Sequence, residues 1–435
     1  MKLHKYKLID VATCEISNID KKTKSGEQSV RLCNFTDVYY NWAVTESMSE
    51  KFMVATASDS QISKLSLKKG QVAITKDSET RHDIGIPCYI AVTLKDCVLG
   101  YHCALITPNP ELLDGRYLNA YLNSKLAKEY FANNASGSGM RYSLPIDAIK
   151  NIVLYLPDIE TQRAVGKIFS NIDRKIALNR EINRNLEAMA RQLYDYWFVQ
   201  FDFPDENGRP YKSSGGKMVW NEKLRREIPE GWIISTIGNI ASLNISSLSK
   251  KDDLRELLYL DTSSLTENKI DTVQHIKRDD APSRAQRKVS KNTILYSTVR
   301  PRLKHFGILC NPPDNLIAST GFCTIDANNI SYSFWLYLFL TEEKIIKNLG
   351  DIADTAVSSY PSIGPSDIEG LQVCLGNDGL MALFYEKVSA LFEIIESNQN
   401  ENNELQKQRD ELLPLLMNGQ VSVMPLATNC DLSHD

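Results

Sequence analysis

The sequence lacks the features that mark secreted, membrane and metal-binding proteins. Its nine cysteines form no Cys-x-x-Cys pair, and its six histidines form no pair at metal-ligand spacing. We therefore expect buried or free thiols in a reducing cytosol, and no metal or other cofactor held by this chain. No apolar run is long enough to span a bilayer, and residues 1–6 lack the apolar core of a signal peptide. These absences predict a cytoplasmic protein without a membrane partner.

An excess of positive charge is also lacking, which argues against a generic nucleic-acid binder. The chain has 435 residues and a formal net charge of −4 at pH 7. The charge is unevenly distributed, however. Residues 269–304 hold ten Lys and Arg against three Asp, whereas residues 378–417 hold eight acids against three bases. The first region is suited to facing phosphate and the second is not.

An internal repeat divides the chain, whose length allows two or three domains. At an offset of 219 residues, 149–193 matches 368–412 without a gap. Further matches are 8–12 with 237–241 at an offset of 229, and 72–75 with 294–297 at an offset of 222. Loop insertions in two copies of one domain produce such a shrinking offset, and the period is too long for a solenoid. The repeat therefore predicts two related globular domains.

Each copy has the pattern of a mixed α+β globular part followed by one long helix. The apolar helical stretches are expected at 117–130 and 333–349. Short strands, broken by Gly, Pro and Asn, are expected at 71–75, 89–93, 293–298 and 321–325. The long helices are expected from Pro157 to about Trp197 and from Gly379 to Leu413, because both stretches are almost free of Gly and Pro.

Both long helices repeat apolar residues every seven positions, which predicts a two-stranded coiled coil. The first helix leads from the first globular part to the second, and the second helix leaves the second part, so the two must pair antiparallel within one chain. We expect Asn179 and Asn183 opposite Asn402 and Asn398, where buried asparagines fix the register at a cost in stability. The alternative is that these are solvated positions on a loose helix.

Two similar heads joined by a rigid coiled coil suit duplex DNA, whose strands are related by two-fold axes. Each head is expected to meet a major groove about one helical turn from the other. Because the heads are similar but not identical, the expected site is asymmetric and split, with an unread spacer whose length the coiled coil sets.

Candidate DNA contacts lie at corresponding places in the two heads. In the first head they lie in a Gly-flanked loop at 136–142 and after the strand at 71–75. In the second head they precede and follow the matching strand at 293–298, and a loop at 357–360 corresponds to the loop at 136–142. The candidate side chains are Lys76, Arg81, Ser138, Arg141, Arg284, Arg287, Lys288, Arg300, Arg302 and Lys304. Arginine pairs bidentately with guanine, whereas lysine mostly contacts phosphate. The alternative for each is a solvated surface charge.

Three segments resemble a known family. Residues 156–163, Leu-Pro-Asp-Ile-Glu-Thr-Gln-Arg, look like the opening of a conserved helix, and 193–204 with 228–232 are similar to the end of that helix and the start of a second domain. Residues 412–421 resemble the closing signature of the same family. Together they resemble the DNA-specificity subunits of type I restriction-modification systems over nearly the whole chain. In the second copy, 374–377 replace the Leu-Pro opening.

The resemblance implies a domain organisation and a set of partners. The expected segments are a target-recognition domain at 1–156, a conserved helix at 157–200, a linker at 201–230, a second target-recognition domain at 231–376, a second conserved helix at 377–419 and a tail at 420–435. The implied partners are double-stranded DNA, two modification subunits that methylate adenine N6 with S-adenosylmethionine, and two restriction subunits that use ATP and magnesium. The coiled coil and adjoining head surfaces would contact these subunits.

Catalysis by this chain is not expected. Asn311-Pro312-Pro313-Asp314 resembles an adenine-methyltransferase motif but lacks the aromatic residue that stacks on the flipped base. No Ser/His/Asp or paired-carboxylate site follows from the spacing of residues. Two alternatives stay open. One is a coiled-coil scaffold whose heads bind proteins, which a pI near 6.0 slightly favours; the other is a specificity subunit without functional partners.

Overall fold

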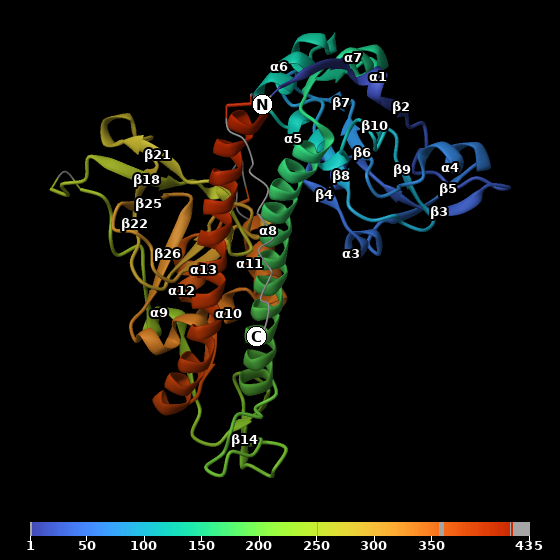
Figure 1. Ribbon diagram of the computed structural model, residues 1–435. Helices are drawn as coiled ribbons and strands as arrows, with labels where there is room; N and C mark the ends of the chain where they lie inside the picture. The colour runs from blue at the N-terminus through green and yellow to red at the C-terminus, as the bar shows by residue number, and fades with distance from the viewer. Residues whose placement is uncertain (1, 250, 356–360, 418, 421–435) are drawn as a thin grey trace, which may run out of the picture. The chain divides into compact units, whose positions relative to one another are not determined.

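The computed structural model describes residues 2–249, 251–355, 361–417 and 419–420. Contacts divide the chain into two compact units, Met1–Asn179 with Asn400–Asp435, and Arg180–Gln399. Each unit contains one globular part of mixed helix and sheet and about half of each long helix (Figure 1). The predicted α+β class with two long helices is therefore confirmed, and each half of the coiled coil belongs to the unit of one globular part.

The globular part of the first unit packs two sheets and short helices around shared apolar cores. Strand β1 (His4–Lys7) pairs with β13 (Val153–Leu156) and brings the start of the chain to the base of the first long helix. One sheet has the order β2-β10-β6-β8-β4, and a second has the order β5-β3-β9. Their strands are β2 (Ala12–Ile16), β10 (Cys103–Pro108), β6 (Val72–Thr75), β8 (Pro87–Ile90), β4 (Ala43–Val44), β5 (Met53–Ala57), β3 (Gln28–Cys33) and β9 (Cys97–Leu99). The helices are α1 (Leu8–Val11), α2 (Phe35–Tyr39), α3 (Glu46–Ser49), α4 (Asp59–Leu65), α5 (Gly115–Leu122), α6 (Lys125–Asn134) and α7 (Ile146–Asn151).

The second unit has a related topology, with four strands in each main sheet where the first unit has five and three. Strand β16 (Ile233–Thr236) pairs with β27 (Gln372–Leu375), and the two main sheets have the orders β17-β26-β23-β24 and β21-β18-β25-β22. Their strands are β17 (Ala241–Leu243), β26 (Phe322–Ala327), β23 (Thr293–Ser297), β24 (Phe306–Leu309), β21 (Gln274–Lys277), β18 (Glu256–Leu260), β25 (Leu316–Ser319) and β22 (Ala285–Lys288). A short hairpin joins β19 (Leu265–Thr266) to β20 (Lys269–Ile270). The helices are α9 (Ile237–Ile240), α10 (Ser333–Leu340), α11 (Glu343–Thr355) and α12 (Pro365–Glu369).

The matched elements confirm the internal repeat. Helix α1 corresponds to α9, and β6 corresponds to β23, at the places that the sequence offsets predict. In both units a parallel pair, β3 with β9 and β18 with β25, lies in the second sheet. Strands β6 and β23 are buried at every position, because apolar side chains cover both faces of these central strands.

The long helices pair antiparallel within each unit. They are α8 (Ile159–Tyr194), which continues as one π-helical turn over Asp195–Val199, and α13 (Asp378–Met417). In the first unit the beginning of α8 shares a core with the end of α13, and Asn179 Nδ2 donates to Asn402 Oδ1 at 3.1 Å. In the second unit the end of α8 packs on the beginning of α13, and Asn398 Nδ2 donates to Asn183 Oδ1 at 2.8 Å. These are the pairs that the heptad pattern predicts.

One expectation about local structure is wrong, and the segment expected as a linker is folded. The apolar stretches at 117–130 and 333–349 are each two helices, because Ser124 caps the start of α6 and the Thr341 hydroxyl donates to carbonyls at the end of α10. The segment at 201–230, expected as a linker, is folded. It contains a hairpin of β14 (Met218–Asn221) and β15 (Arg226–Pro229), and Phe203 stacks between Tyr211 and Trp232 in the apolar core of the second unit.

The two long helices begin differently, as the sequence departure at 374–377 indicates. In the first unit Gln162 is buried; its side-chain oxygen accepts from the Asp114 N–H, and its amide donates to the carbonyls of Leu112 and Pro157. The corresponding residue in the second unit is the buried Met381, and Asn377 accepts a hydrogen bond from the Leu380 N–H at 2.9 Å. An apolar contact and a local cap thus replace the polar anchor of the first copy.

Two other predictions concern thiols and membranes. Eight cysteines within the described residues are free, and seven of these are buried, as expected for reduced structural thiols. Over the same residues, no helix has the length and apolar character needed to cross a bilayer.

Candidate nucleic-acid interface

A small three-stranded sheet gathers the candidate residues of the first unit. It has the order β11-β12-β7, with β11 (Ser136–Ser138), β12 (Arg141–Ser143) and β7 (Asp77–Ser78). The segment at 136–142, expected as a loop, is therefore a hairpin with a two-residue turn. Gly139 has a φ of +70°, which such tight turns require, and a Cβ at Gly137 would lie 2.1 Å from the Arg141 carbonyl oxygen.

The hairpin brings together side chains from two distant segments. Ser138 and Arg141 pair across its end and are exposed, and Lys76 precedes β7 directly. The guanidinium carbon of Arg81 lies 5.4 Å from the centre of the Tyr142 ring, within the range of a cation–π interaction. All four candidate residues of the first head thus lie in or next to one small sheet.

Asp77 organises the polar groups beside this sheet. Its carboxylate lies 2.8 Å from Lys76 Nζ and 2.6 Å from His102 Nδ1. Burial alone would raise the pKa of Asp77, but hydrogen bonds from Lys76, Ser143 and His102 outweigh it and lower that pKa. Sequence reasoning did not identify His102, because it lies on a separate turn, where its carbonyl accepts from the Lys76 N–H at 2.8 Å.

The second unit builds a similar surface around the turn that follows β25. The Thr298 N–H donates to the Gly321 carbonyl at 3.0 Å, as Lys76 does to His102 in the first unit. Val299 forms a bridge with Ser362, and the Arg300 N–H donates to the Pro361 carbonyl at 2.9 Å. The predicted loop at 357–360 lies outside the described residues.

The basic residues of the second unit are closely associated with carboxylates. Arg302 lies 2.5 Å from Asp351 and 2.9 Å from Asp354, both on α11. Lys304 lies 2.5 Å from Glu343 and 3.4 Å from Glu267. Lys288 on β22 lies 2.7 Å from Asp252. Acids from other segments thus offset much of the local positive charge that the sequence shows at 269–304.

The remaining candidates of the second unit lie on or beside β22. Arg284 is exposed, and its carbonyl accepts from the Thr320 N–H at 2.8 Å, so this segment borders the same turn as Thr298. Arg287 is half-buried within β22. The structure therefore brings two basic segments of the second unit to one turn.

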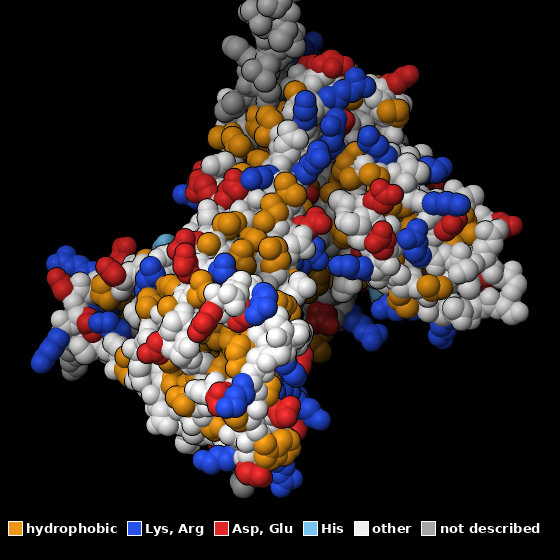
Figure 2. All heavy atoms as spheres, turned by 90° about the horizontal axis from the view of Figure 1, so that it is seen from below, with side chains coloured by type: hydrophobic (Ala, Val, Ile, Leu, Met, Phe, Trp, Pro, Cys, Tyr) orange, Lys and Arg blue, Asp and Glu red, His pale blue; other side chains and the backbone are white. Residues whose placement is uncertain are grey.

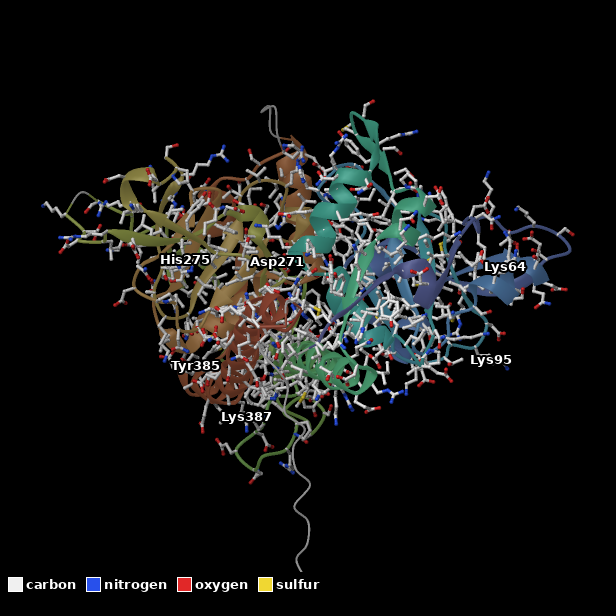
Figure 3. All side chains as sticks on the ribbon, turned by 45° about the horizontal axis from the view of Figure 1, so that its top comes forward. Lys64, Lys95, Asp271, His275, Tyr385 and Lys387 are labelled. Atoms are coloured by element: carbon white, nitrogen blue, oxygen red, sulfur yellow. The ribbon has the colours of Figure 1, made fainter. Side chains whose placement is uncertain are left out.

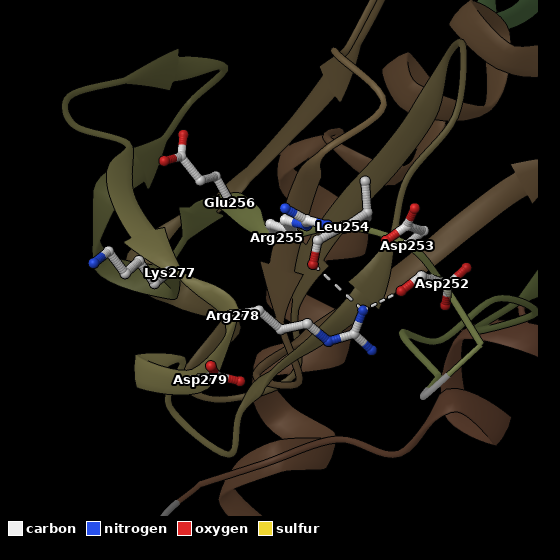
Figure 4. A pocket seen from close by; sticks show the side chains of 8 residues that line it. All are labelled: Asp252, Asp253, Leu254, Arg255, Glu256, Lys277, Arg278 and Asp279. Atoms are coloured by element: carbon white, nitrogen blue, oxygen red, sulfur yellow. Dashed lines mark hydrogen bonds between the residues drawn. The ribbon is translucent and has the colours of Figure 1, made fainter.

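A polar pocket near β18 contains cations that the sequence analysis did not single out. It is lined by Asp252, Asp253, Leu254, Arg255, Glu256, Lys277, Arg278 and Asp279 (Figure 4). The Arg278 guanidinium donates to the carbonyls of Asp252, Leu254 and Ser249. Arg278 therefore holds the 249–254 segment in place, and Arg255 and Lys277 are the other basic groups of the pocket.

Charged side chains are spread widely over the surface. Figure 2 shows Lys and Arg interspersed with Asp and Glu on the visible face. Lys64 and Lys95 of the first unit and His275 of the second, labelled in Figure 3, are exposed but were not predicted as contacts. Net charge alone therefore does not distinguish a nucleic-acid interface from the rest of the surface, and the small sheet of the first unit and the turn of the second unit stay candidates.

Comparisons with known proteins agree with this architecture. Residues 6–188 match a family model described as a type I restriction modification DNA specificity domain. The chain is 24% identical over 413 residues to the HindI specificity subunit of Haemophilus influenzae, covering 82% of this chain and 88% of that protein. It is 23% identical over 367 residues to the MjaIX specificity subunit of Methanocaldococcus jannaschii, covering 82% and 79%. The fold resembles the crystal structure of a type I S subunit from M. genitalium, with a TM-score of 0.55, 14% identity and 96% coverage of both chains.

Proposed function

We propose that this chain is a type I restriction-modification specificity subunit, as its similarity to such subunits over most of its length indicates, and that its two heads read the two halves of a split, asymmetric DNA site. The observation that carries the proposal is the duplicated topology with different side chains at matched positions. The first head presents a hairpin that carries Arg141, with Arg81 packed on its Tyr142 ring, and the second presents Arg300 beside a bridged turn. Two heads with related folds but different side chains at matched positions are suited to reading two different half-sites.

A map of N6-methyladenine across the genome tests the proposal. Single-molecule sequencing would compare cells that carry the cognate modification subunit with and without this gene. We expect a split, non-palindromic motif that appears only when the gene is present. Absence of a gene-dependent motif, with both proteins expressed, would instead support a protein-binding scaffold or a subunit without functional partners.

Arg300 provides a test of the second head. We propose that Arg300→Ala weakens or relaxes readout at one half-site only. Arg302→Ala is the matched control, because that guanidinium lies between Asp351 and Asp354. Equal loss of affinity for all DNA sequences in the Arg300 variant would reduce its role to a phosphate contact.

We propose further that α8 docks the modification subunits. Two residues of α8, Ile182 and Met189, and Tyr196 in the π-helical turn that follows lie seven residues apart. They are 36%, 54% and 37% exposed, so they form an apolar stripe outside the buried seam. Met189→Glu should weaken co-purification with the modification subunit, whereas Leu126→Glu, at an exposed apolar position on α6, should not. Unchanged co-purification of the Met189 variant would place docking elsewhere.

The chemistry is assigned to the partner subunits. We propose that two modification subunits use S-adenosylmethionine to methylate adenine N6, and that two restriction subunits use ATP and magnesium. Mass measurement of the assembled complex would test this stoichiometry. A complex with one modification subunit would contradict the expectation that each head serves one.

A further inference from the structure

Met140 is unusually exposed for an apolar side chain. It is 77% exposed, more than any other large apolar residue that the structure describes. It lies at the tip of the β11–β12 hairpin, between Gly139 and Arg141. A single exposed apolar residue needs no explanation by itself, but this one occupies the point of a projecting element whose base is firmly held.

The base of the hairpin is fixed by backbone pairing. Tyr142 and Ser143 pair with Ser78 and Asp77, and the Leu144 N–H donates to the Lys76 carbonyl at 2.6 Å. The positive φ of Gly139 allows the strands to close over two residues. The tip is therefore presented on a two-stranded ribbon in a defined orientation.

The charges around the ribbon indicate what it meets. Arg141 follows Met140 directly and Arg81 packs on the adjacent Tyr142 ring, whereas Lys76 at the base is paired with the Asp77 carboxylate. Positive groups flanking an apolar tip are complementary to a DNA groove, where phosphates border the base edges. The major groove admits a two-stranded β-ribbon, and the apolar group that it displays is the thymine methyl.

We infer that the β11–β12 hairpin enters the major groove of the half-site read by the first head, and that Met140 contacts a thymine methyl group there. This inference rests on the proposed function and adds the reading element and one base feature that it recognises. Arg141 and Arg81 flank this contact and hold the ribbon against base edges or phosphates.

Replacing thymine by uracil, which lacks only the methyl group, tests the contact. The full-length chain in complex with its modification subunit would be titrated with DNA duplexes that carry the motif found by methylation mapping. In these duplexes each thymine of the half-site read by the first head is replaced by uracil in turn. We expect one replacement to weaken binding roughly fourfold, the effect of losing one buried methyl group. Met140→Ser should bind both duplexes about equally, and Leu126→Ser should retain the wild-type discrimination.

Gly137→Ala gives an independent variant that leaves the exposed tip residues unchanged. Because a Cβ there would clash with the Arg141 carbonyl oxygen, the hairpin should distort. The preference for specific bases should then fall at the half-site read by the first head and stay unchanged at the other. The inference is overturned if the wild-type complex distinguishes no thymine from uracil in that half-site, or if Met140→Ser keeps the discrimination. Failure of the wild-type complex to bind any specific sequence would overturn the proposed function and this inference with it.

Discussion

At the scale of single residues, the carboxyl group of Glu187 in the second unit has a pKa that burial raises. It lies on α8 within 3.5 Å of Asn268 Nδ2, and Asn268 also accepts from the Ile308 N–H and, through its carbonyl, from Gln399. Burial raises the pKa of Glu187 to about 7, although the Asn268 hydrogen bond and Arg191 lower it; the nearby Glu267 raises it further. Ionised Glu187 therefore opposes folding.

We predict that Glu187→Gln stabilises the protein at high pH. The folded-state pKa is raised, so the protonated group stabilises the fold below about pH 4.5, and this contribution is lost as the pH rises through about 7. The variant should gain up to about 3 kcal/mol in free energy of unfolding at pH 8 and almost nothing at pH 4.5. Urea unfolding at both pH values measures this. A gain of equal size at both would contradict a titration effect.

At the scale of elements, the paired asparagines predict a non-additive response. Asn183→Leu alone leaves Asn398 without its partner in the seam and should cost about 1–3 kcal/mol of unfolding free energy. Adding Asn398→Leu should recover most of that loss, because Asn183 is buried and Asn398 half-buried, so an apolar pair fits there. A double-mutant cycle by urea unfolding measures the coupling. Additive losses would show that the two side chains act separately.

The coiled coil also predicts how the DNA spacer is set. Inserting seven residues at 179–183 in α8 and seven at 398–402 in α13 lengthens the coiled coil by about 10 Å. Since base pairs rise about 3.4 Å, the spacer in the methylated motif should lengthen by about three base pairs while both half-sites stay the same. Methylation mapping of the variant measures both quantities. Altered half-sites with an unchanged spacer would contradict the prediction that the length of the coiled coil sets the spacer.

At the scale of the whole molecule, the net charge is −4, so we expect phosphate binding to depend on local clusters of basic residues. Arg81→Ala should therefore lower the slope of log affinity against log salt by about one for the complex with the modification subunit, which is the effect of losing one phosphate contact. Arg302→Ala should leave the slope unchanged, because carboxylates of α11 already pair with it. The reverse result would mean that Arg302 exchanges its internal partners for DNA.

Repeats and periodic patterns made much of the fold predictable. The 219-residue offset identified two related heads, and the heptads placed Asn179 with Asn402 and Asn183 with Asn398. Chain topology supplied the antiparallel direction, because one chain that leaves each head by a long helix has no other way to pair the two.

Contacts between distant segments were not predictable in the same way. The 136–142 segment has the composition of a loop, and it becomes a hairpin because β7, about 65 residues earlier, supplies a third strand. Likewise, Arg302 and Lys304 look like free cations until α11 brings Asp351, Asp354 and Glu343 beside them. The aromatic residues that fold the 201–230 segment gave no periodic signal.

The sequence by itself determined the duplication, the α+β class and the pairing of the long helices, because these depend on spacing along the chain. Only the tertiary structure decided which cations face carboxylates, which form a surface with His102 and Tyr142, and where Met140 projects. The physical reason is that charge pairing and exposure depend on distances between side chains from separate strands and helices, and those distances exist only once the sheets have formed.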